Sequence, residues 1–367
     1  MKTCGAIALA CVLAVTAWPW DKKQKKEQET QTLQLPRELP TALAVETRKL
    51  VFEVSPLSSK GLLSQQVRDG LRALQRSAGG TAVRLRAFVA GTGDVRRVRD
   101  MVSEAYTARR LPLPVLTVVL VGALPLEGAQ VVFESTAVAK KDVNPHGLAF
   151  ISGQVATSDD PLGPVEPLAS KALDGLRTAV STAGVTSGDV LRVTCFLSSL
   201  EDITKVRTMF ERAYPGAVRN YVQAQRVPSR GIAECEAVAR LSSPPASPLE
   251  MRHAGSAPPS PHYSQIAMVA APQVVLTGMQ AAFGFQDADA RLAFERLDKV
   301  LAQSGSSLKH AAFAGFYPLS AGIAQQVRKI RADFIDPQHP PAATMLPFES
   351  LPAMDAGFAV DVIAVKQ

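Results

Sequence analysis

Residues 97–106 read RVRDMVSEAY and residues 205–214 read KVRTMFERAY, so one pattern occurs at two distant places in the chain. The stretch QVRKI at residues 326–330 begins a third copy. Apolar residues recur at helical spacing within each copy, which predicts an amphipathic helix. Each copy is followed by a loop containing Pro or Gly, an extended segment, a Leu-Pro or Val-Pro step and a final apolar strand. This internal repeat predicts three related units.

The pattern is most complete around the second copy, where it predicts the order β-α-β-α-β-β. The first helix contains apolar residues at helical spacing and ends at Gly184. Helices that cover one face of a sheet define an α+β unit, so we predict an α+β fold. The other face needs a partner, which two sibling units could supply. The predicted elements are a strand at 147–155, a helix at 166–183, a strand at 190–197, a helix at 200–214, and a closing hairpin of strands 220–227 and 232–239.

The predicted domains follow the repeat. Residues 46–140 form unit one, residues 141–243 unit two and residues 262–367 unit three. Residues 21–45 are polar and contain Pro, which is typical of a tether. Residues 244–261 are rich in Pro and Ser, which predicts a loose linker without structure of its own.

The first twenty residues, MKTCGAIALACVLAVTAWPW, combine one Lys with an apolar run. Val15-Thr16-Ala17 places small residues where a signal peptidase needs them, so cleavage after Ala17 and export to the periplasm or the extracellular space are expected. The alternative is an uncleaved membrane anchor with its lysine-rich flank in the cytoplasm. The protein is cytoplasmic if the segment is not used. We expect membrane contact only through this segment.

Composition excludes several classes of protein. With 47% hydrophobic and 20% charged residues, the chain is neither disordered nor a coiled coil. The formal charge of +7 is spread along the chain, so no nucleic acid partner is expected. The five His show no ligand spacing, so no metal site is expected. Beyond the first twenty residues, the cysteines are Cys195 and Cys235. Their separation favours two free buried thiols, with a disulfide as the alternative.

Unit two contains a set of short motifs in a fixed order. They are Ser152-Gly153-Gln154, Gly188-Asp189-Val190, Arg219-Asn220-Tyr221-Val222, Arg226-Val227-Pro228 and Glu234-Cys235-Glu236-Ala237. Through these motifs, unit two resembles the RidA/YjgF family (endoribonuclease L-PSP-like) along nearly its whole length. Unit three resembles this family through residues 277–280 and 361–364, and unit one resembles it least. Family members are usually homotrimers of a chorismate-mutase-like unit, with sites between subunits. The resemblance therefore implies three tandem units that form an intramolecular pseudo-trimer, in a chain that acts as a monomer.

The resemblance also implies an activity and its residues. Family members hydrolyse reactive enamines and imines, such as 2-aminoacrylate, to 2-keto acids and ammonia without a cofactor. The arginine that binds the substrate carboxylate corresponds to Arg219, and the glutamate that positions or activates water corresponds to Glu234. Tyr263 matches a tyrosine that a neighbouring subunit contributes, which favours a cleft between units two and three. We therefore expect Glu234 and Arg219 to be catalytic and a small 2-imino or 2-keto acid as the ligand. The substrate-binding residues predicted are Arg219, Tyr221, Ser152, Gly153 and Tyr263.

Strand alternation and the repeat limit this chemistry to one place. Alternation puts Arg219 and Glu234 on one polar face if their strands form the predicted hairpin. The other two units lack both groups, so at most one cleft is competent. The equivalent positions hold Leu116 and Val132 in unit one, and Ala343 and Ala359 in unit three.

Structural roles are open for the same charged residues. Arg219 and Glu234 could form an ion pair that fixes packing, and Glu236 is expected to pair with a basic residue of another unit. The recurrence of Arg99, Arg207 and Arg328 favours a scaffold role for all three.

Three functions follow from the residues and the resemblance. The first is a hydrolytic enamine/imine deaminase. The second is a non-catalytic pseudo-trimer that binds small carboxylates or a protein. The third is a ribonuclease, which no pair of catalytic His supports.

Overall fold

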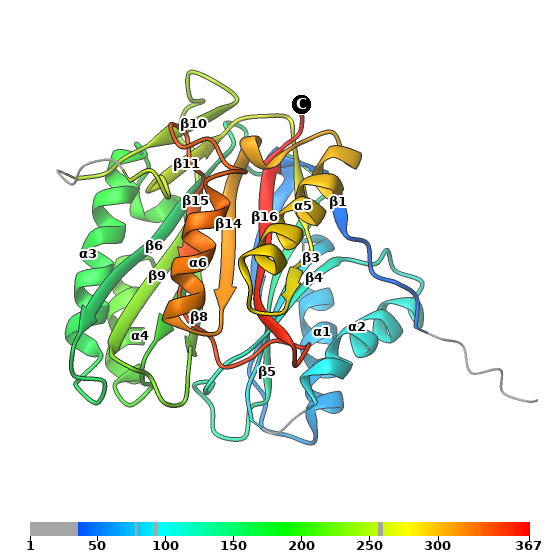
Figure 1. Cartoon of the computed structure of the whole chain (residues 1–367), viewed down its shortest axis with the longest axis vertical. Coiled ribbons are helices and arrows are strands. Elements are labelled where there is room, and N and C mark those ends of the chain that lie inside the picture. The colour runs from blue at the N-terminus through cyan, green and yellow to red at the C-terminus, as the bar shows by residue number, and fades with distance from the viewer. Residues whose placement is uncertain (1–35, 78, 92–93, 256–259) are drawn as a thin grey trace, which may run out of the picture. The chain divides into compact units, whose positions relative to one another are not determined.

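The computed structural model describes residues 36–77, 79–91, 94–255 and 260–367, and Arg37–Gln367 form one unit (Figure 1). The predicted signal peptide or anchor at 1–20 lies outside the described residues. Within the described ranges, no helix has the length and apolar character that spanning a membrane requires.

Three β-sheets carry the fold. The first sheet contains, in spatial order, β2 (Leu50–Val54), β5 (Val131–Ala139), β3 (Gly80–Val89) and β4 (Val115–Leu120). The second sheet contains β10 (Leu249–Arg252), β11 (Ile266–Val269), β6 (Leu148–Ser158), β9 (Gly231–Arg240), β7 (Val190–Leu197) and β8 (Val218–Gln223). The third sheet contains β1 (Ala42–Glu46), β12 (Gln273–Thr277), β16 (Ala356–Val365), β14 (Ala311–Pro318) and β15 (Ala342–Met345), with β13 (Gln280–Phe283) also paired to β16.

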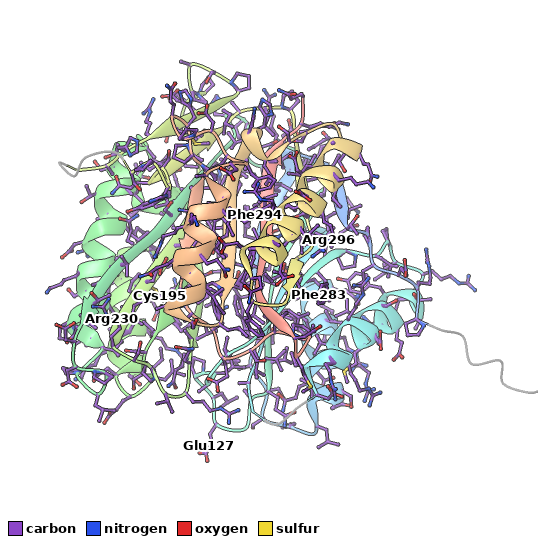
Figure 2. All side chains as sticks on the ribbon, in the orientation of Figure 1. Glu127, Cys195, Arg230, Phe283, Phe294 and Arg296 are labelled. Atoms are coloured by element: carbon purple, nitrogen blue, oxygen red, sulfur yellow. A yellow bond between two sulfur atoms is a disulfide. The ribbon has the colours of Figure 1, made fainter. Side chains whose placement is uncertain are left out.

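Each sheet has two helices on one face. They are α1 (Leu63–Ser77) and α2 (Val98–Thr107) on the first sheet, α3 (Glu166–Thr182) and α4 (Ile203–Ala213) on the second, and α5 (Asp287–Gln303) and α6 (Ala321–Arg331) on the third (Figure 1). Apolar side chains fill the space between helices and sheet, as with Phe294 of α5 (Figure 2), which packs on Phe316 and Phe358. The predicted α+β class is confirmed.

The predicted closing hairpin in the second sheet is wrong. β7 lies between β8 and β9, parallel to β8 and antiparallel to β9. The physical reason is the helix α4 between β7 and β8, because a helical crossover brings the next strand back parallel to the first. Because β8 and β9 are not neighbours, the alternation of side chains along one strand does not determine which side chains of the other share its face.

The predicted tether and linker also contribute strands. β10, inside the segment 244–261, pairs with β11 in the second sheet, so that segment is not wholly loose. β1, most of which belongs to the predicted tether, pairs with β12 in the third sheet. β11, from the start of unit three, pairs with β6 of unit two. Backbone groups at a sheet edge gain hydrogen bonds from an added strand, which explains why these short segments are ordered.

The faces opposite the helices pack against one another and enclose a charged cluster. We define the central cluster as Arg84, Arg86, Arg192, Glu134, Glu236 and Asp361, all of them buried. Nη2 of Arg84 lies 2.7 Å from Oδ1 of Asp361, and Nη2 of Arg86 lies 2.5 Å from Oε1 of Glu236. The predicted pairing of Glu236 with a basic residue of another unit is thus confirmed.

The central cluster is compensated in charge. Burial alone would raise the pKa of Glu134, but Arg86 and Arg192, with hydrogen bonds from Asn220 and Thr194, lower it to about 2. Buried carboxylates persist only with such partners. The cluster therefore joins the inner faces of the three sheets without leaving excess charge inside.

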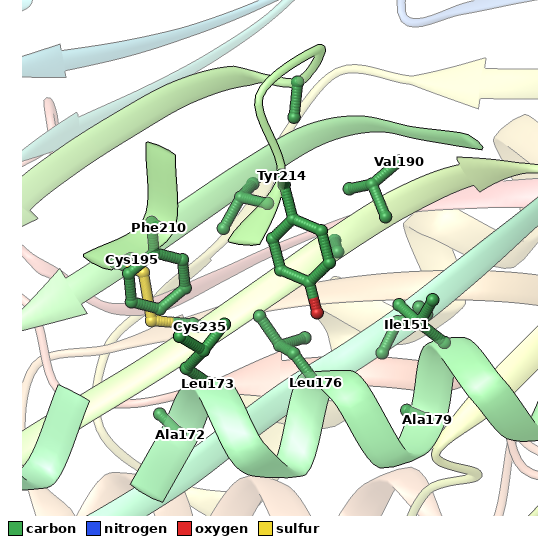
Figure 3. Packing of buried hydrophobic residues seen from close by; sticks show 14 of the residues in the cluster. Ile151, Ala172, Leu173, Leu176, Ala179, Val190, Cys195, Phe210, Tyr214 and Cys235 are labelled. Atoms are coloured by element: carbon green, nitrogen blue, oxygen red, sulfur yellow. A yellow bond between two sulfur atoms is a disulfide. The ribbon is translucent and has the colours of Figure 1, made fainter. Parts of the chain in front are cut away.

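The cysteines are bonded, which corrects the favoured prediction of free thiols. Cys195 on β7 and Cys235 on β9 face each other across two antiparallel strands and form a disulfide beneath Phe210 (Figure 3). A separation of 40 residues in the sequence does not indicate that the two cysteines lie opposite each other on neighbouring strands. Strand pairing alone brings the two sulfur atoms together.

We expect the disulfide to stabilise the fold. A loop of this length predicts a loss of roughly 4 kcal/mol in the free energy of unfolding when both cysteines are changed to Ala. Alkylation of denatured protein, with and without reductant, followed by mass spectrometry reports the bond itself, and urea unfolding measures the loss. Alkylation of Cys195 and Cys235 without reductant would contradict the pairing.

Candidate functional site

A cavity with buried polar groups lies between the second and third sheets and measures about 570 Å³. We call it the main cavity. Its walls come from β6 and β9 on one side and from α6 and β15 on the other, with the segment 260–263 at one edge. Polar and charged side chains reach it from each of these parts, among them Glu234, Tyr263, Arg328 and Arg331. Arg230, labelled in Figure 2, also lines it and is paired with Asp159.

Glu234 is the acid of the main cavity. It lies on β9, is 6% exposed, and its Oε1 accepts a hydrogen bond of 3.4 Å from the backbone N–H of Met345 on β15. Burial raises its pKa to about 7, the N–H of Met345 and the charge of Arg328 oppose the rise, and Glu236 adds to it. A carboxyl group with this pKa can both take and give a proton near neutral pH.

Gly153 provides the room for this carboxyl group. Ser152 and Gly153 lie where the register of β6 against β9 shifts, which marks a bulge. A Cβ atom on Gly153 would come within 2.7 Å of Cδ of Glu234. Only glycine leaves the glutamate side chain in its observed place.

Ser152 lies beside the wall of the main cavity, where its hydroxyl group forms two hydrogen bonds to other segments. Its hydroxyl donates a hydrogen bond of 2.6 Å to the carbonyl of Ser264 and accepts one of 2.7 Å from the N–H of Ala343. Ser152 is fully buried and is not among the residues that line the main cavity. Its hydroxyl ties the second sheet to the third.

Arg219 does not lie with Glu234. Tyr221, two residues along β8, packs in the core under α3 and α4 with Cys235, whereas Glu234 faces away from that core. The predicted shared face is wrong because β7 separates the two strands and their alternation is offset. The ion pair between Arg219 and Glu234 is absent from the described residues. Nη1 of Arg219 instead donates a hydrogen bond of 2.8 Å to the carbonyl of Tyr214, and Nη2 lies 3.8 Å from Glu211.

Arg219 and Tyr221 line a second cavity of about 510 Å³ against the first sheet. Val132 lines it too, at the place that the resemblance gives to a glutamate. The second cavity therefore has the arginine without the acid. The main cavity has the acid, with Ala343 at the place of the arginine.

Tyr263 lies in the segment between β10 and β11, at the edge of the main cavity. It is 36% exposed and lines the main cavity together with Glu234 and Gly153. Of the predicted site residues, these three come together, and Arg219, Tyr221 and Ser152 do not join them.

Two arginines that line the main cavity, Arg328 and Arg331, are not among the site residues predicted from the sequence. The recurrence of Arg99, Arg207 and Arg328 was interpreted as scaffold, but each of the three lines a different cavity. The recurrence of an arginine at this position is thus the sequence feature that could have indicated a cavity residue. The repeat also offers a signal for Arg331, because the aligned positions hold apolar residues, Val102 and Phe210.

Among the residues that the structure describes, no group of three or more His, Cys, Asp or Glu side chains is placed to hold a metal ion.

The fold is α+β, and the main cavity lies between two of its sheets. Residues 139–241 match the family model described as Endoribonuclease L-PSP. Protein DfrA of Myxococcus xanthus is 30% identical over 98 residues, which are 25% of this chain and 75% of that protein. The chain belongs to the RidA/YjgF family.

Similar solved structures carry related names. TdcF of E. coli with bound serine is 27% identical over 28% of this chain and 85% of that chain, with a TM-score of 0.22. A putative endoribonuclease of Thermotoga maritima is 26% identical over 25% of this chain and 78% of that chain, also with a TM-score of 0.22. Each match covers only part of this chain.

We predict that Gly153→Ala displaces Glu234. The added methyl group collides with the carboxyl group, so Glu234 turns away from Met345 and towards solvent, and its pKa falls towards the ordinary value. Infrared or carbon-13 NMR titration of the Glu234 carboxyl group measures this change. Gly188→Ala is the control, because a Cβ there meets only Thr186 at 3.8 Å. An unchanged pKa in Gly153→Ala would contradict this account of the bulge.

Proposed function

We propose that the chain is a cofactor-independent deaminase that hydrolyses reactive enamines and imines to 2-keto acids and ammonia in the main cavity. The observation that carries the proposal is Glu234, a buried carboxyl group with a pKa of about 7 at the wall of a cavity. Perturbed acids in cavities are typical of catalytic groups. Family membership supports a deaminase or a related activity.

The proposed steps need only water, substrate and Glu234. The Glu234 carboxylate takes a proton from water while the water oxygen bonds to the imine carbon, and the C=N π electrons move to nitrogen. The carbinolamine then collapses: Glu234 returns the first proton to nitrogen, the hydroxyl proton passes through the Glu234 carboxylate to nitrogen as the O–H electron pair forms the C=O bond, and the C–N bond breaks with its electron pair leaving on nitrogen as NH3. The products are a keto acid and ammonia. An enamine such as 2-aminoacrylate enters this sequence after a proton moves to its terminal carbon.

We also propose that the three sheets represent three tandem family units in a pseudo-trimer. Their registers support it. Glu134, Glu236 and Asp361 occupy equivalent positions, opposite Arg86, Thr194 and Gly315 on the neighbouring strands. On this alignment the main cavity and the second cavity are equivalent clefts, each with one unit's final strand on one side and another unit's parallel strand on the other.

The second candidate function is binding without turnover, which the position of Arg219 favours. The group that the family uses for the substrate carboxylate lies in the second cavity, away from Glu234. A chain of this kind would hold a small carboxylate and release no product.

For the compartment, we propose export. Residues 1–20 carry the signal, and the disulfide between Cys195 and Cys235 supports an oxidising environment.

The test measures keto-acid release from 2-aminoacrylate generated in situ by a coupled enzyme. We expect a rate above the uncatalysed background, and a fall in kcat/KM of about 10²- to 10⁴-fold in Glu234→Gln. Because the base must be ionised, kcat/KM should rise as pH increases through about 7, the pKa of Glu234. This rise should disappear in the variant.

Glu201→Gln is the matched control, since Glu201 is exposed and lies outside the main cavity. Folding is checked at pH 8. The raised pKa means that ionised Glu234 costs folding stability above pH 7, so Glu234→Gln should be as stable as the parent or more stable there. Equal rates in Glu234→Gln and Glu201→Gln would overturn the proposal. Thermal stabilisation by a keto acid without any turnover would replace it with the binding function.

A further inference from the structure

Arg331 is an unusual residue for its position. It lies at the end of α6, three residues after Arg328, and is 3% exposed. In the aligned helices, the residues three positions after Arg99 and Arg207 are Val102 and Phe210, both fully buried in apolar cores. One helix of the three thus has a guanidinium where the other two have an apolar side chain.

Arg331 has no ionic partner in the described part of the chain. Its side chain takes part in no hydrogen bond or salt bridge there, and its Nε is buried without a partner. Its guanidinium carbon lies 4.9 Å from the centroid of the Phe316 ring. Burial and the charge of Arg328 lower its pKa to about 10, so it remains charged at neutral pH. Burying a charge without a partner is costly, so a group from outside the chain is the expected partner.

Arg328 provides a second positive charge in the same cavity. Residues three apart on a helix share a face, with about 4.5 Å between them along the axis. Arg328 is exposed and, like Arg331, has no salt bridge among the described residues. It lowers the pKa of Glu234, so its charge acts on the proposed catalytic acid as well as on Arg331.

Among the described residues that line the main cavity, Glu234 alone can oppose the charge of the two arginines. His262 lines the same cavity, and burial and the two arginines lower its pKa, so it is neutral near pH 7. Arg230 is paired with Asp159. Glu234 is the single described carboxyl group that lines the main cavity. The α6 side of the cavity therefore has two positive charges to be matched by a ligand.

We propose that Arg331 and Arg328 form a two-point anion site in the main cavity, and that the ligand is a small molecule with two carboxylates. Arg331 binds the distal carboxylate inside the cavity, and Arg328 binds the carboxylate next to the reacting carbon, which lies towards Glu234. A guanidinium can hold a carboxylate through two parallel hydrogen bonds. Resting on the proposed function, this makes the substrate a 2-imino dicarboxylic acid. Water converts it to the 2-oxo dicarboxylic acid and ammonia, with the same bonds formed and broken as above.

Calorimetric titration of the purified full chain with product-like acids tests the site without requiring turnover. The probes are 2-oxoglutarate, which has two carboxylates, 2-oxobutanoate, which has one, and inorganic phosphate. We expect 2-oxoglutarate to bind at least tenfold more tightly than 2-oxobutanoate at low salt. Arg331→Gln and Arg328→Gln should each weaken the binding of 2-oxoglutarate by about tenfold to hundredfold. Arg331→Gln should affect 2-oxobutanoate much less, because that acid has no distal carboxylate.

Lys329→Gln is the matched control. It removes one positive charge from the same helix, but Lys329 is exposed, is paired with Asp287 at 3.3 Å and does not line the cavity. Lys329→Gln should bind 2-oxoglutarate as tightly as the parent protein does. If Arg331→Gln does not fold, Arg328→Gln still tests the site. Arg328 is exposed, so we expect its substitution to leave the fold intact.

The outcomes separate the site from the activity. Equal affinity for 2-oxoglutarate and 2-oxobutanoate, equal binding of phosphate, or unchanged binding in both arginine variants would overturn the two-point site. Tight binding of 2-oxoglutarate that Arg331→Gln removes would support the site even if no imine were hydrolysed. In that case the deaminase, and not the anion site, would be the failed proposal.

Discussion

The pairing of buried charges in the central cluster is the constraint on which the arrangement of the sheets depends. Its three arginines and three carboxylates come from all three sheets, and Arg84 of the first sheet pairs with Asp361 of the third. Removing one partner from such a cluster leaves a charge without compensation and costs about 3–5 kcal/mol. The inner faces must therefore meet in the register that satisfies every charge. Apolar residues around the cluster then pack from several sheets at once.

This register also determines what lies in each cavity. Glu234 is two residues before Glu236 on β9, so it shares the face of the central cluster and emerges at its edge in the main cavity. Val132 and Ala359 hold the same place before Glu134 and Asp361, and neither has a carboxyl group. The single acid is thus placed by the contacts that hold the sheets together. The positive groups that reach it come from α6, and Arg219 remains on the opposite face of its own sheet.

The sequence predicted what depends on local periodicity. Helical spacing gave the helix at Glu166–Thr182 closely, and strand alternation correctly put Glu234 and Glu236 on one face, opposite Cys235. What failed depends on contacts between distant residues. Alternation says nothing about which strand lies next to which, so the insertion of β7 between β8 and β9 was missed, and with it the separation of Arg219 from Glu234. The disulfide was missed for the same reason.

Arg331 shows a different limit of sequence reasoning. An arginine at the end of an amphipathic helix is usually exposed, and only the alignment with Val102 and Phe210 indicates that this position is buried. In the folded chain, α6 meets the main cavity, and no carboxylate among the described residues forms a salt bridge with Arg331.

The measurement that tests the central claim most directly is a crystal structure of the full chain with 2-oxoglutarate. The account predicts that the ligand lies in the main cavity, with one carboxylate on Arg331 and the oxo carbon towards Glu234. A ligand beside Arg219 in the second cavity, or a main cavity without ligand at a concentration that saturates binding in solution, would contradict it.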